Sequence, residues 1–250
     1  MKISVITATY NCNDVIDHAL KSINNQTYDN IEHIVIDGGS VDGTVEKLKQ
    51  NTICKLVSES DDGIYDALNK GIQAASGDVI GILHSDDEFA SKDIVSKIAE
   101  EFSSDSSVSA VYGDLIYVHR KDSTRMIRYW KSKPFDFKML TNGWMPPHPT
   151  LYVKKDFYEE LGGYNLNYKI AADYSFVLSL FSSPNFKSVY LPEVIVKMKL
   201  GGASNHSIKA IFNKSLEDWR ILRNFGFNSF ACFSTLTMKN LSKLNKFRFK

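Results

Sequence analysis

The chain has 250 residues, a formal net charge of +1 at pH 7 and 43% hydrophobic residues. These values are ordinary for a globular protein, and the balanced charge excludes the basic excess typical of nucleic-acid-binding proteins. The three cysteines, Cys12, Cys54 and Cys232, lack metal-ligand spacing, which favours a reducing compartment. Because no signal peptide and no run of about 20 apolar residues is present, we expect a cytoplasmic protein with at most peripheral membrane contact.

The first hundred residues alternate strands and helices. Strands are expected over residues 3–8, 32–37, 53–57 and 79–83. Each is followed by a segment in which apolar residues recur at helical spacing, and we expect Asn13 or Asp14 to cap the first helix and Asp42 the second. This alternation predicts a parallel sheet with helices on both faces, which binds ligands beyond the carboxyl ends of its strands.

The second half of the chain is less regular. A long strand over residues 108–118 is expected at a sheet edge. Further strands are expected over 125–131, 150–153 and 188–198, and a helix over 173–181. From Ser204 a long helix is expected to turn an apolar face inward, formed by Ile208, Ile211, Phe212, Leu216, Trp219 and Leu222.

An acidic run, Asp86-Asp87-Glu88, lies just beyond the apolar strand over residues 79–83. Adjacent carboxylates repel one another, and a divalent cation relieves that repulsion through oxygen ligands. Mg²⁺ is usually held by one or two carboxylates plus substrate phosphates, so the run predicts a metal–diphosphate site. The alternative is a solvated loop leading into the next helix, with Ser91 as its N-cap.

Polar residues also follow the other three strands. They lie at residues 7–11, 37–40 and 59–62. An aspartate after a strand can accept hydrogen bonds from a ribose, and neighbouring glycines allow a ligand close to the backbone. A plain turn is the alternative for residues 37–40. Because the chain lacks a P-loop lysine and a Gly-x-Gly-x-x-Gly motif, the pattern indicates a different nucleotide site.

Taken together, these segments resemble a known family. Residues 5–11, 36–44, 58–71 and 83–87 resemble family-two glycosyltransferases of the GT-A type, and the similarity continues in order through 148–150, 161–164, 171–174 and 201–204. It covers roughly residues 2–205 and is strongest to bacterial enzymes that build surface polysaccharides.

The resemblance implies an α/β fold of the GT-A type. Such a fold has a Rossmann-like, mostly parallel sheet with flanking helices, here followed by a C-terminal helical extension. Residues 1–205 would form the glycosyltransferase domain, with a nucleotide-sugar-binding half at 1–100 and an acceptor-binding half at 101–205. Residues 206–250 would form C-terminal helices.

The resemblance also implies an activity. The enzyme would move a hexose or N-acetylhexosamine from a UDP-sugar to a saccharide acceptor, with inversion at C1 and with Mn²⁺ or Mg²⁺ as cofactor. The acceptor would be linked to polyprenyl diphosphate, and the product would be an O-antigen, capsule or exopolysaccharide. One alternative is a non-catalytic nucleotide-binding module of the same fold. The other, a nucleotidyltransferase, needs a basic glycine-rich loop after the first strand, and residues 8–14 contain no Gly, Lys or Arg.

Residue by residue, the resemblance assigns a donor site. Thr7, Tyr10 and Asp37 would hold uracil and ribose. Asp61 and Lys70 would line the donor pocket.

The same resemblance assigns the reacting groups. Asp86 would bind the metal that bridges the diphosphate, and Asp173 would be the general base on the acceptor hydroxyl, with a helix N-cap as its plainer role. His84 stands where the family has the first acid of an Asp-x-Asp motif. Imidazole can ligate Mn²⁺ but suits Mg²⁺ poorly, so Asp86 is the one ligand predicted.

Three further residues are candidates for the acceptor or the diphosphate. Trp144 could stack on a sugar ring or simply cover the core, and His148 lies in a rigid Pro-Pro-His-Pro loop where a structural role is the alternative. Ser204 follows Gly201-Gly202-Ala203 and could contact the diphosphate at a helix start, or serve as an N-cap.

The C-terminus carries a separate pattern. Residues 239–250 contain five basic residues and no acid, and a helical wheel places Lys239, Lys243, Lys246 and Lys250 on one face. A basic amphipathic helix suits an anionic membrane surface, such as the inner face of the plasma membrane. The alternative is a solvated terminal helix with one core-facing stripe.

Overall fold

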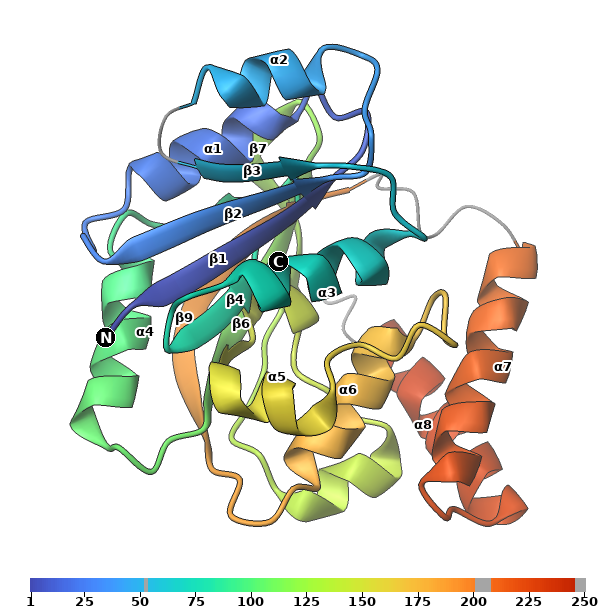
Figure 1. Cartoon of the computed structure of the whole chain (residues 1–250). Coiled ribbons are helices and arrows are strands. Elements are labelled where there is room, and N and C mark those ends of the chain that lie inside the picture. Colours follow the sequence, from blue (N-terminus) through green and yellow to red (C-terminus); the bar gives the residue numbers. More distant parts are fainter. Residues whose placement is uncertain (52–53, 201–207, 246–250) are drawn as a thin grey trace.

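One twisted sheet organises the molecule (Figure 1). The computed structural model describes residues 1–51, 54–200 and 208–245. Within these residues nine strands pair in the order β3-β2-β1-β4-β8-β6-β9-β5, with β7 added beside β6. The sheet continues from the first half of the chain into the second, because β4 pairs with the antiparallel β8.

The first four strands form the parallel part of this sheet. They are β1 (Ile3–Thr9), β2 (Ile31–Asp37), β3 (Cys54–Ser58) and β4 (Val79–Ile82). Ile6 and Ala8 of β1 face one core, and Ile3 and Val5 face the other. Because both faces are covered, β1, most of β2 and β4 are buried, and the predicted parallel strands are confirmed, whereas β3 at the edge is only partly buried.

Helices cover both faces of the sheet. On one side lie α1 (Ile16–Asn24), α2 (Thr44–Lys49) and α4 (Ile94–Ser104). On the other lie α3 (Ile64–Ala74), α5 (Lys155–Leu161) and α6 (Ala172–Phe181). The predicted cap of α1 is wrong, because Val15 occupies that position and no side chain caps the helix. The predicted cap of α2 is displaced by one residue, because Gly43 occupies the N-cap position, while the Asp42 carboxylate before it accepts from the Thr44 N–H at 3.1 Å.

The predicted position of the long strand at a sheet edge is also wrong. This strand, β6 (Ala110–His119), lies inside the sheet. Its partners are β7 (Asp122–Trp130), β8 (Tyr152–Lys154) and β9 (Ser188–Lys199). Its Tyr112 is fully buried, with its hydroxyl donating to the Lys133 carbonyl at 2.8 Å. The two-residue β5 (Glu88–Phe89) pairs with β9 at one end of the sheet.

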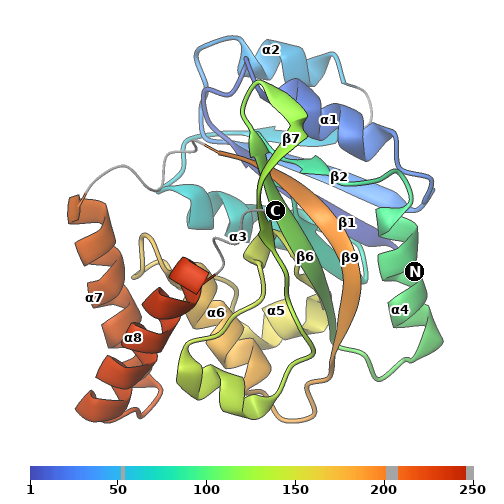
Figure 2. The same ribbon diagram turned by 180° about the vertical axis from the view of Figure 1, so that it is seen from behind.

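The C-terminal helices α7 (Ile208–Asn224) and α8 (Ser229–Asn245) pack beside α6 and the short helix η1 (Phe137–Asn142) (Figure 2). The predicted inward face of α7 is partly wrong. Leu222 is buried, but Phe212 and Leu216 are exposed, and the side chains of Ile208 and Ile211 lie outside the described residues. The inward face instead includes the polar Asp218, which could not be predicted from the spacing of apolar residues alone. None of the helices in the described part of the chain is long and apolar enough to cross a membrane.

Candidate functional site

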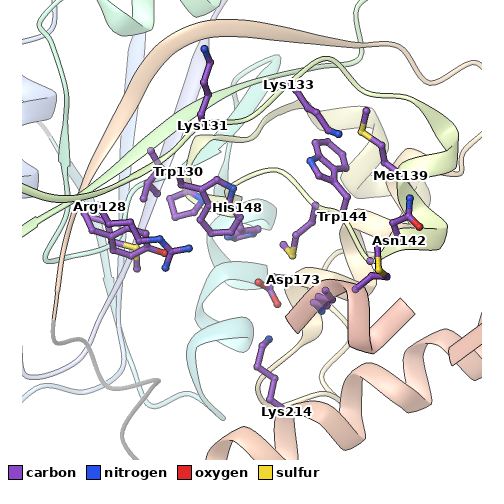
Figure 3. Close-up of a pocket in the computed structure, with 18 of the residues that line it drawn as sticks. Arg128, Trp130, Lys131, Lys133, Met139, Asn142, Trp144, His148, Asp173 and Lys214 are labelled. Carbon is purple, nitrogen blue, oxygen red and sulfur yellow. The ribbon is translucent and has the colours of Figure 1, made fainter. Parts of the chain in front are cut away.

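A cavity of about 620 Å³ lies beyond the carboxyl end of β4 (Figure 3). Its walls come from β6, β7, η1, the start of α6 and both C-terminal helices. Four residues considered from the sequence line it: His84, Trp144, His148 and Asp173. Cavities at this edge of an open α/β sheet are where ligands bind in such folds.

Asp173 is the second residue of α6 and is held by its surroundings. The N-cap position of α6 is Ala171, so the predicted capping role of Asp173 is wrong. The Tyr65 hydroxyl lies 3.2 Å from the Asp173 carboxylate and 2.9 Å from the Ile170 carbonyl. The Glu217 carboxylate accepts from the backbone N–H groups of residues 169, 170 and 171, which fixes the segment that leads into the helix.

The carboxylate of Asp173 stays ionised. Burial alone would raise its pKa, but positive charge outweighs burial and lowers the pKa below its ordinary value; that charge comes from His148 once its ring is protonated at acidic pH, and from Lys214 and Lys239. Figure 3 shows Lys214 reaching from α7 towards Asp173. An ionised, partly buried carboxylate in a cavity can accept a proton from a bound hydroxyl.

Two histidines lie on the wall nearest β4. The rings of His84 and His148 are 6.4 Å apart, and His148 Nε2 is 2.8 Å from the Tyr164 hydroxyl. Burial lowers the pKa of His148 to about 4 and also lowers that of His84, although the charge of Asp173 opposes both shifts. Both imidazoles are therefore neutral at pH 7, the form in which histidine binds metals.

The acidic run after β4 is not a solvated loop. Asp87 is fully buried, and burial raises its pKa well above the ordinary value. Its carboxylate accepts from the Lys199 N–H at 3.3 Å. Ser91 is not the N-cap of α4 either, because Asp93 occupies that position.

Asp86 and His84 are the donors that this loop could offer a cation. No group of three or more His, Cys, Asp or Glu side chains suited to a metal occurs in the described part of the chain. Asp86 is half-buried, and its negative charge opposes the lowering of the His84 pKa by burial. One carboxylate and one imidazole fit a cation that takes its remaining ligands from a bound diphosphate and water.

Thr7 and Asp37, two of the predicted donor residues, are fully buried. The Thr7 hydroxyl lies 3.0 Å from His33 Nε2. The Asp37 carboxylate accepts from the N–H groups of Gly39 and Ser40, at 3.1 and 3.0 Å, and from the Ser58 hydroxyl. These two side chains therefore form internal hydrogen bonds that fix the backbone at the ends of β1 and β2.

Tyr10 and Asp61, two other predicted donor residues, lie at the surface of the same strand ends. Tyr10 is 62% exposed. Asp61 lies so close to Gly38 that a Cβ there would be 2.5 Å from its carboxylate oxygen, so a larger residue at position 38 would displace the Asp61 side chain.

Lys70, the remaining donor candidate, is ion-paired. Its ammonium lies 2.9 Å from Glu59 and 3.4 Å from Asp66, and it donates to the Ser60 carbonyl. The residues predicted to bind the donor do not line the 620 Å³ cavity. Ser204 lies outside the described residues.

The cavity also contains residues that the sequence analysis missed. These are chiefly Tyr117, Arg128, Trp130, Lys214 and, in this role, Lys239. Arg128 and Trp130 lie two positions apart on β7, and Tyr117 pairs with Arg128 across the strands. The alternation of side chains along a strand over residues 125–131 could have shown that Arg128 and Trp130 lie on the same face. Nothing in the sequence indicates that this face lines a cavity.

Lys239 corrects the prediction of a solvent-facing basic stripe. It is only 5% exposed, its ammonium lies 2.9 Å from the Asp218 carboxylate, and it sits over the Tyr174 ring at 3.2 Å. The side chains of Lys243, Lys246 and Lys250 lie outside the described residues. Helical periodicity identified a shared face but not the acidic and aromatic partners that bury it.

Comparison with known proteins gives consistent results. A family model described as Glycosyl transferase family 2 matches residues 4–159. An uncharacterized glycosyltransferase of Mycobacterium tuberculosis is 37% identical over 180 residues, which is 70% of this chain and 67% of that protein. A PGL/p-HBAD biosynthesis glycosyltransferase of Mycobacterium bovis is 28% identical over 221 residues, covering 85% of this chain and 83% of the relative.

Two solved structures share the fold. One is a mannosyltransferase from Pyrobaculum calidifontis in complex with GDP-Man and Mn²⁺, with a TM-score of 0.65 and 19% identity, covering 91% of this chain and 65% of that one. The other is residues 1–349 of Staphylococcus aureus TarS in complex with UDP-GlcNAc, with a TM-score of 0.66 and 17% identity over 89% of this chain and 65% of that one. The chain thus spans about two thirds of these structures, and the predicted GT-A-like α/β fold is confirmed.

Proposed function

The chain belongs to glycosyl transferase family 2, and from that premise we propose that it transfers a hexose or N-acetylhexosamine from a nucleotide-sugar to a saccharide acceptor. A UDP-sugar is the proposed donor. The nucleotide would lie over the carboxyl ends of β1 to β3, near Tyr10 and Asp61, and the acceptor would enter the cavity beside Asp173.

The proposed chemistry is a single displacement. Asp173 accepts the proton of the acceptor hydroxyl as that oxygen attacks C1 of the donor sugar. The bond between C1 and the diphosphate oxygen breaks on the opposite face, so the configuration at C1 inverts. General base assistance of this kind is typically worth about 10²–10⁴ in rate. The position of Asp173 in the cavity wall, with the Tyr65 hydroxyl 3.2 Å from its carboxylate and positive charges that lower its pKa, is the observation that supports this role best.

Negative charge builds on the leaving diphosphate, and a divalent cation would neutralise it there. Asp86 would hold that cation, with the neutral imidazole of His84 as its second protein ligand. An imidazole ligand favours Mn²⁺ over Mg²⁺.

The test is nucleotide release. Incubation with a panel of UDP- and GDP-sugars and Mn²⁺ should yield free nucleotide with at least one donor, because transferases usually hydrolyse some donor when no acceptor is present. Release should require Asp86. If no donor in the panel were consumed, the non-catalytic nucleotide-binding module would become the better description.

A nucleotidyltransferase is disfavoured by the first loop. Such an enzyme grips a triphosphate with basic and glycine residues, whereas residues 8–14 contain none, and Asn11 and Asn13 are tied to Ser40 and Asp42. Release of diphosphate from a nucleoside triphosphate would be its signature.

We further propose that the acceptor is lipid-linked and that the C-terminal helices contact a membrane surface. Phe230, Phe233 and Leu241 share one face of α8 at spacings of three and eight residues, and they are 82%, 67% and 50% exposed. Exposed apolar residues gathered on one helix face suit insertion into a membrane interface. Such contact would place the reaction at the cytoplasmic face of the plasma membrane, in the synthesis of a bacterial surface polysaccharide.

A further inference from the structure

Positive charge dominates the cavity around Asp173. Its lining residues include one carboxylate, that of Asp173, and five side chains that carry positive charge at pH 7. The five are Arg128, Lys131, Lys133, Lys214 and Lys239. An excess of one sign of charge in a partly enclosed cavity concentrates ligands of the opposite sign.

Only part of this charge is balanced by the protein. Lys239 is paired with Asp218 at 2.9 Å, and both side chains are 6% exposed. By contrast, none of the ion pairs formed between described residues includes Lys131, Lys133 or Lys214. The charge of Lys214 reaches Asp173 and lowers its pKa. Among the described residues, Lys214 is thus a cation outside any ion pair whose charge acts on the proposed reacting group.

The walls between these charges are aromatic. The Arg128 guanidinium lies 5.0 Å from the Tyr117 ring centre and 6.0 Å from that of Trp130, so its plane is held against the wall. Trp144 packs edge-on against Tyr112 and Phe181, at 5.8 and 5.7 Å. Rigid aromatic faces suit the apolar face of a sugar ring, and the cations beside them suit a charged substituent on that ring.

We propose that the acceptor held in this cavity carries a negatively charged group, a carboxylate or a phosphate, beside the hydroxyl that receives the sugar. The inference rests on the proposed function only in calling the bound molecule the acceptor. Lys214 of α7 and Arg128 of β7 supply the positive charge that the negative group meets. The positive charge that favours the ionised form of Asp173 then also selects the acceptor.

Binding of matched small probes tests the inference without any donor. Methyl β-D-glucuronide carries a carboxylate where methyl β-D-glucoside carries a hydroxymethyl group. Glucose 1-phosphate is the third probe and tests for recognition of a phosphate. Because two of the three tryptophans line the cavity, fluorescence titration can report binding. We expect one or both anionic probes to bind at least about tenfold tighter than the glucoside, since a hydrogen bond to a charged group contributes that much. The preferred probe identifies which anion the site takes.

Two variants make the test specific. Lys214→Met should remove most of the preference for the anionic probes, whereas Lys49→Met, which removes the same charge from an exposed site at the end of α2, should leave it intact. Raising the salt concentration should weaken the anionic probes more than the glucoside. Circular dichroism of both variants should match the unaltered protein.

The inference is overturned if neither anionic probe binds tighter than the glucoside, or if the preference survives Lys214→Met. A protein that binds the anionic probes yet releases no nucleotide from any sugar donor would contradict the proposed function alone. A protein that consumes a donor but shows no anion preference would contradict the present inference alone.

Discussion

Lys239 of α8 forms an ion pair with Asp218 of α7 at 2.9 Å, and both side chains are almost completely buried. The pair lies directly behind the proposed base, because the Lys239 ammonium covers the ring of Tyr174 and its charge helps to lower the pKa of Asp173. Residues beyond the 4–159 range matched by the family model therefore form one wall of the candidate site.

Substituting one member of this pair should destabilise the protein more than substituting both members. Lys239→Met leaves the Asp218 carboxylate buried without its cation, which typically costs about 3–5 kcal/mol of unfolding free energy. The double variant Lys239→Met with Asp218→Leu should recover most of that loss, because two apolar side chains replace two buried charges. Urea unfolding of the single and double variants measures the difference. Equal stability of Lys239→Met and the unaltered protein would show that the pair contributes nothing.

Asp173→Asn should lower kcat by at least about a hundredfold and leave donor affinity nearly unchanged, because a general base acts mainly in the transition state. The pKa of Asp173 lies below its ordinary value of 3.8, so the carboxylate is ionised at every pH above that. Titration of Asp173 should therefore cause no loss of kcat between pH 5 and 8. A variant with near-normal turnover, or an acid limb near pH 6, would require another base.

The parallel half of the fold could be predicted from sequence because its strands are buried on both faces and therefore read as short apolar runs between helices. The second half could not, since β6 meets three different strands along its length and no local pattern encodes that. Similarly, His148 and Asp173 were identified by motif, but Lys214 and Lys239 reach the cavity only through the packing of α7 and α8. Thr7 and Asp37 were also identified by motif, but their positions at strand ends did not reveal that both side chains are buried.

A divalent cation should be required, and Mn²⁺ should serve better than Mg²⁺. Chelation with EDTA is expected to abolish transfer, and Asp86→Asn should lower it by at least about a hundredfold, because charge on the leaving diphosphate would be uncompensated. His84→Asp should improve activity with Mg²⁺ relative to Mn²⁺, since an oxygen ligand replaces the imidazole. Full activity in chelator would contradict the metal role of Asp86, and an unchanged metal preference would show that His84 is not a ligand.

His33 should make stability depend on pH. Burial lowers the pKa of this β2 residue from 6.5 to about 4, while in the unfolded chain it keeps its ordinary value. Below pH 6.5 the unfolded state therefore binds more protons, and stability falls as the pH drops towards 4, by about 3 kcal/mol for this group. His33→Gln, which keeps a hydrogen bond to Thr7, should flatten the fall in unfolding free energy between pH 7 and 4. Identical slopes for the variant and the unaltered protein would rule out His33 as the cause.

Membrane contact by the C-terminus can be tested through its basic residues. Deleting residues 239–250 would remove the buried Lys239 and disturb the site, so the charges are better removed by substituting Lys246, Arg248 and Lys250 with Gln. Each basic residue near an anionic surface contributes about 1 kcal/mol, so the triple variant should bind anionic vesicles roughly a hundredfold more weakly, with little change on neutral ones.

The exposed phenylalanines of α8 provide the matching apolar test. Phe230→Ser with Phe233→Ser should weaken binding to anionic and neutral vesicles alike, because burial of apolar area does not depend on lipid charge. Turnover on a short soluble acceptor should persist in both sets of variants, since Phe230 and Phe233 do not line the cavity and the substituted basic residues carry no role in the proposed chemistry. Co-sedimentation at low and high salt separates the two contributions. If all variants sedimented with vesicles as the unaltered protein does, the α8 face would have to cover another protein surface, and the acceptor would reach the cavity from solution.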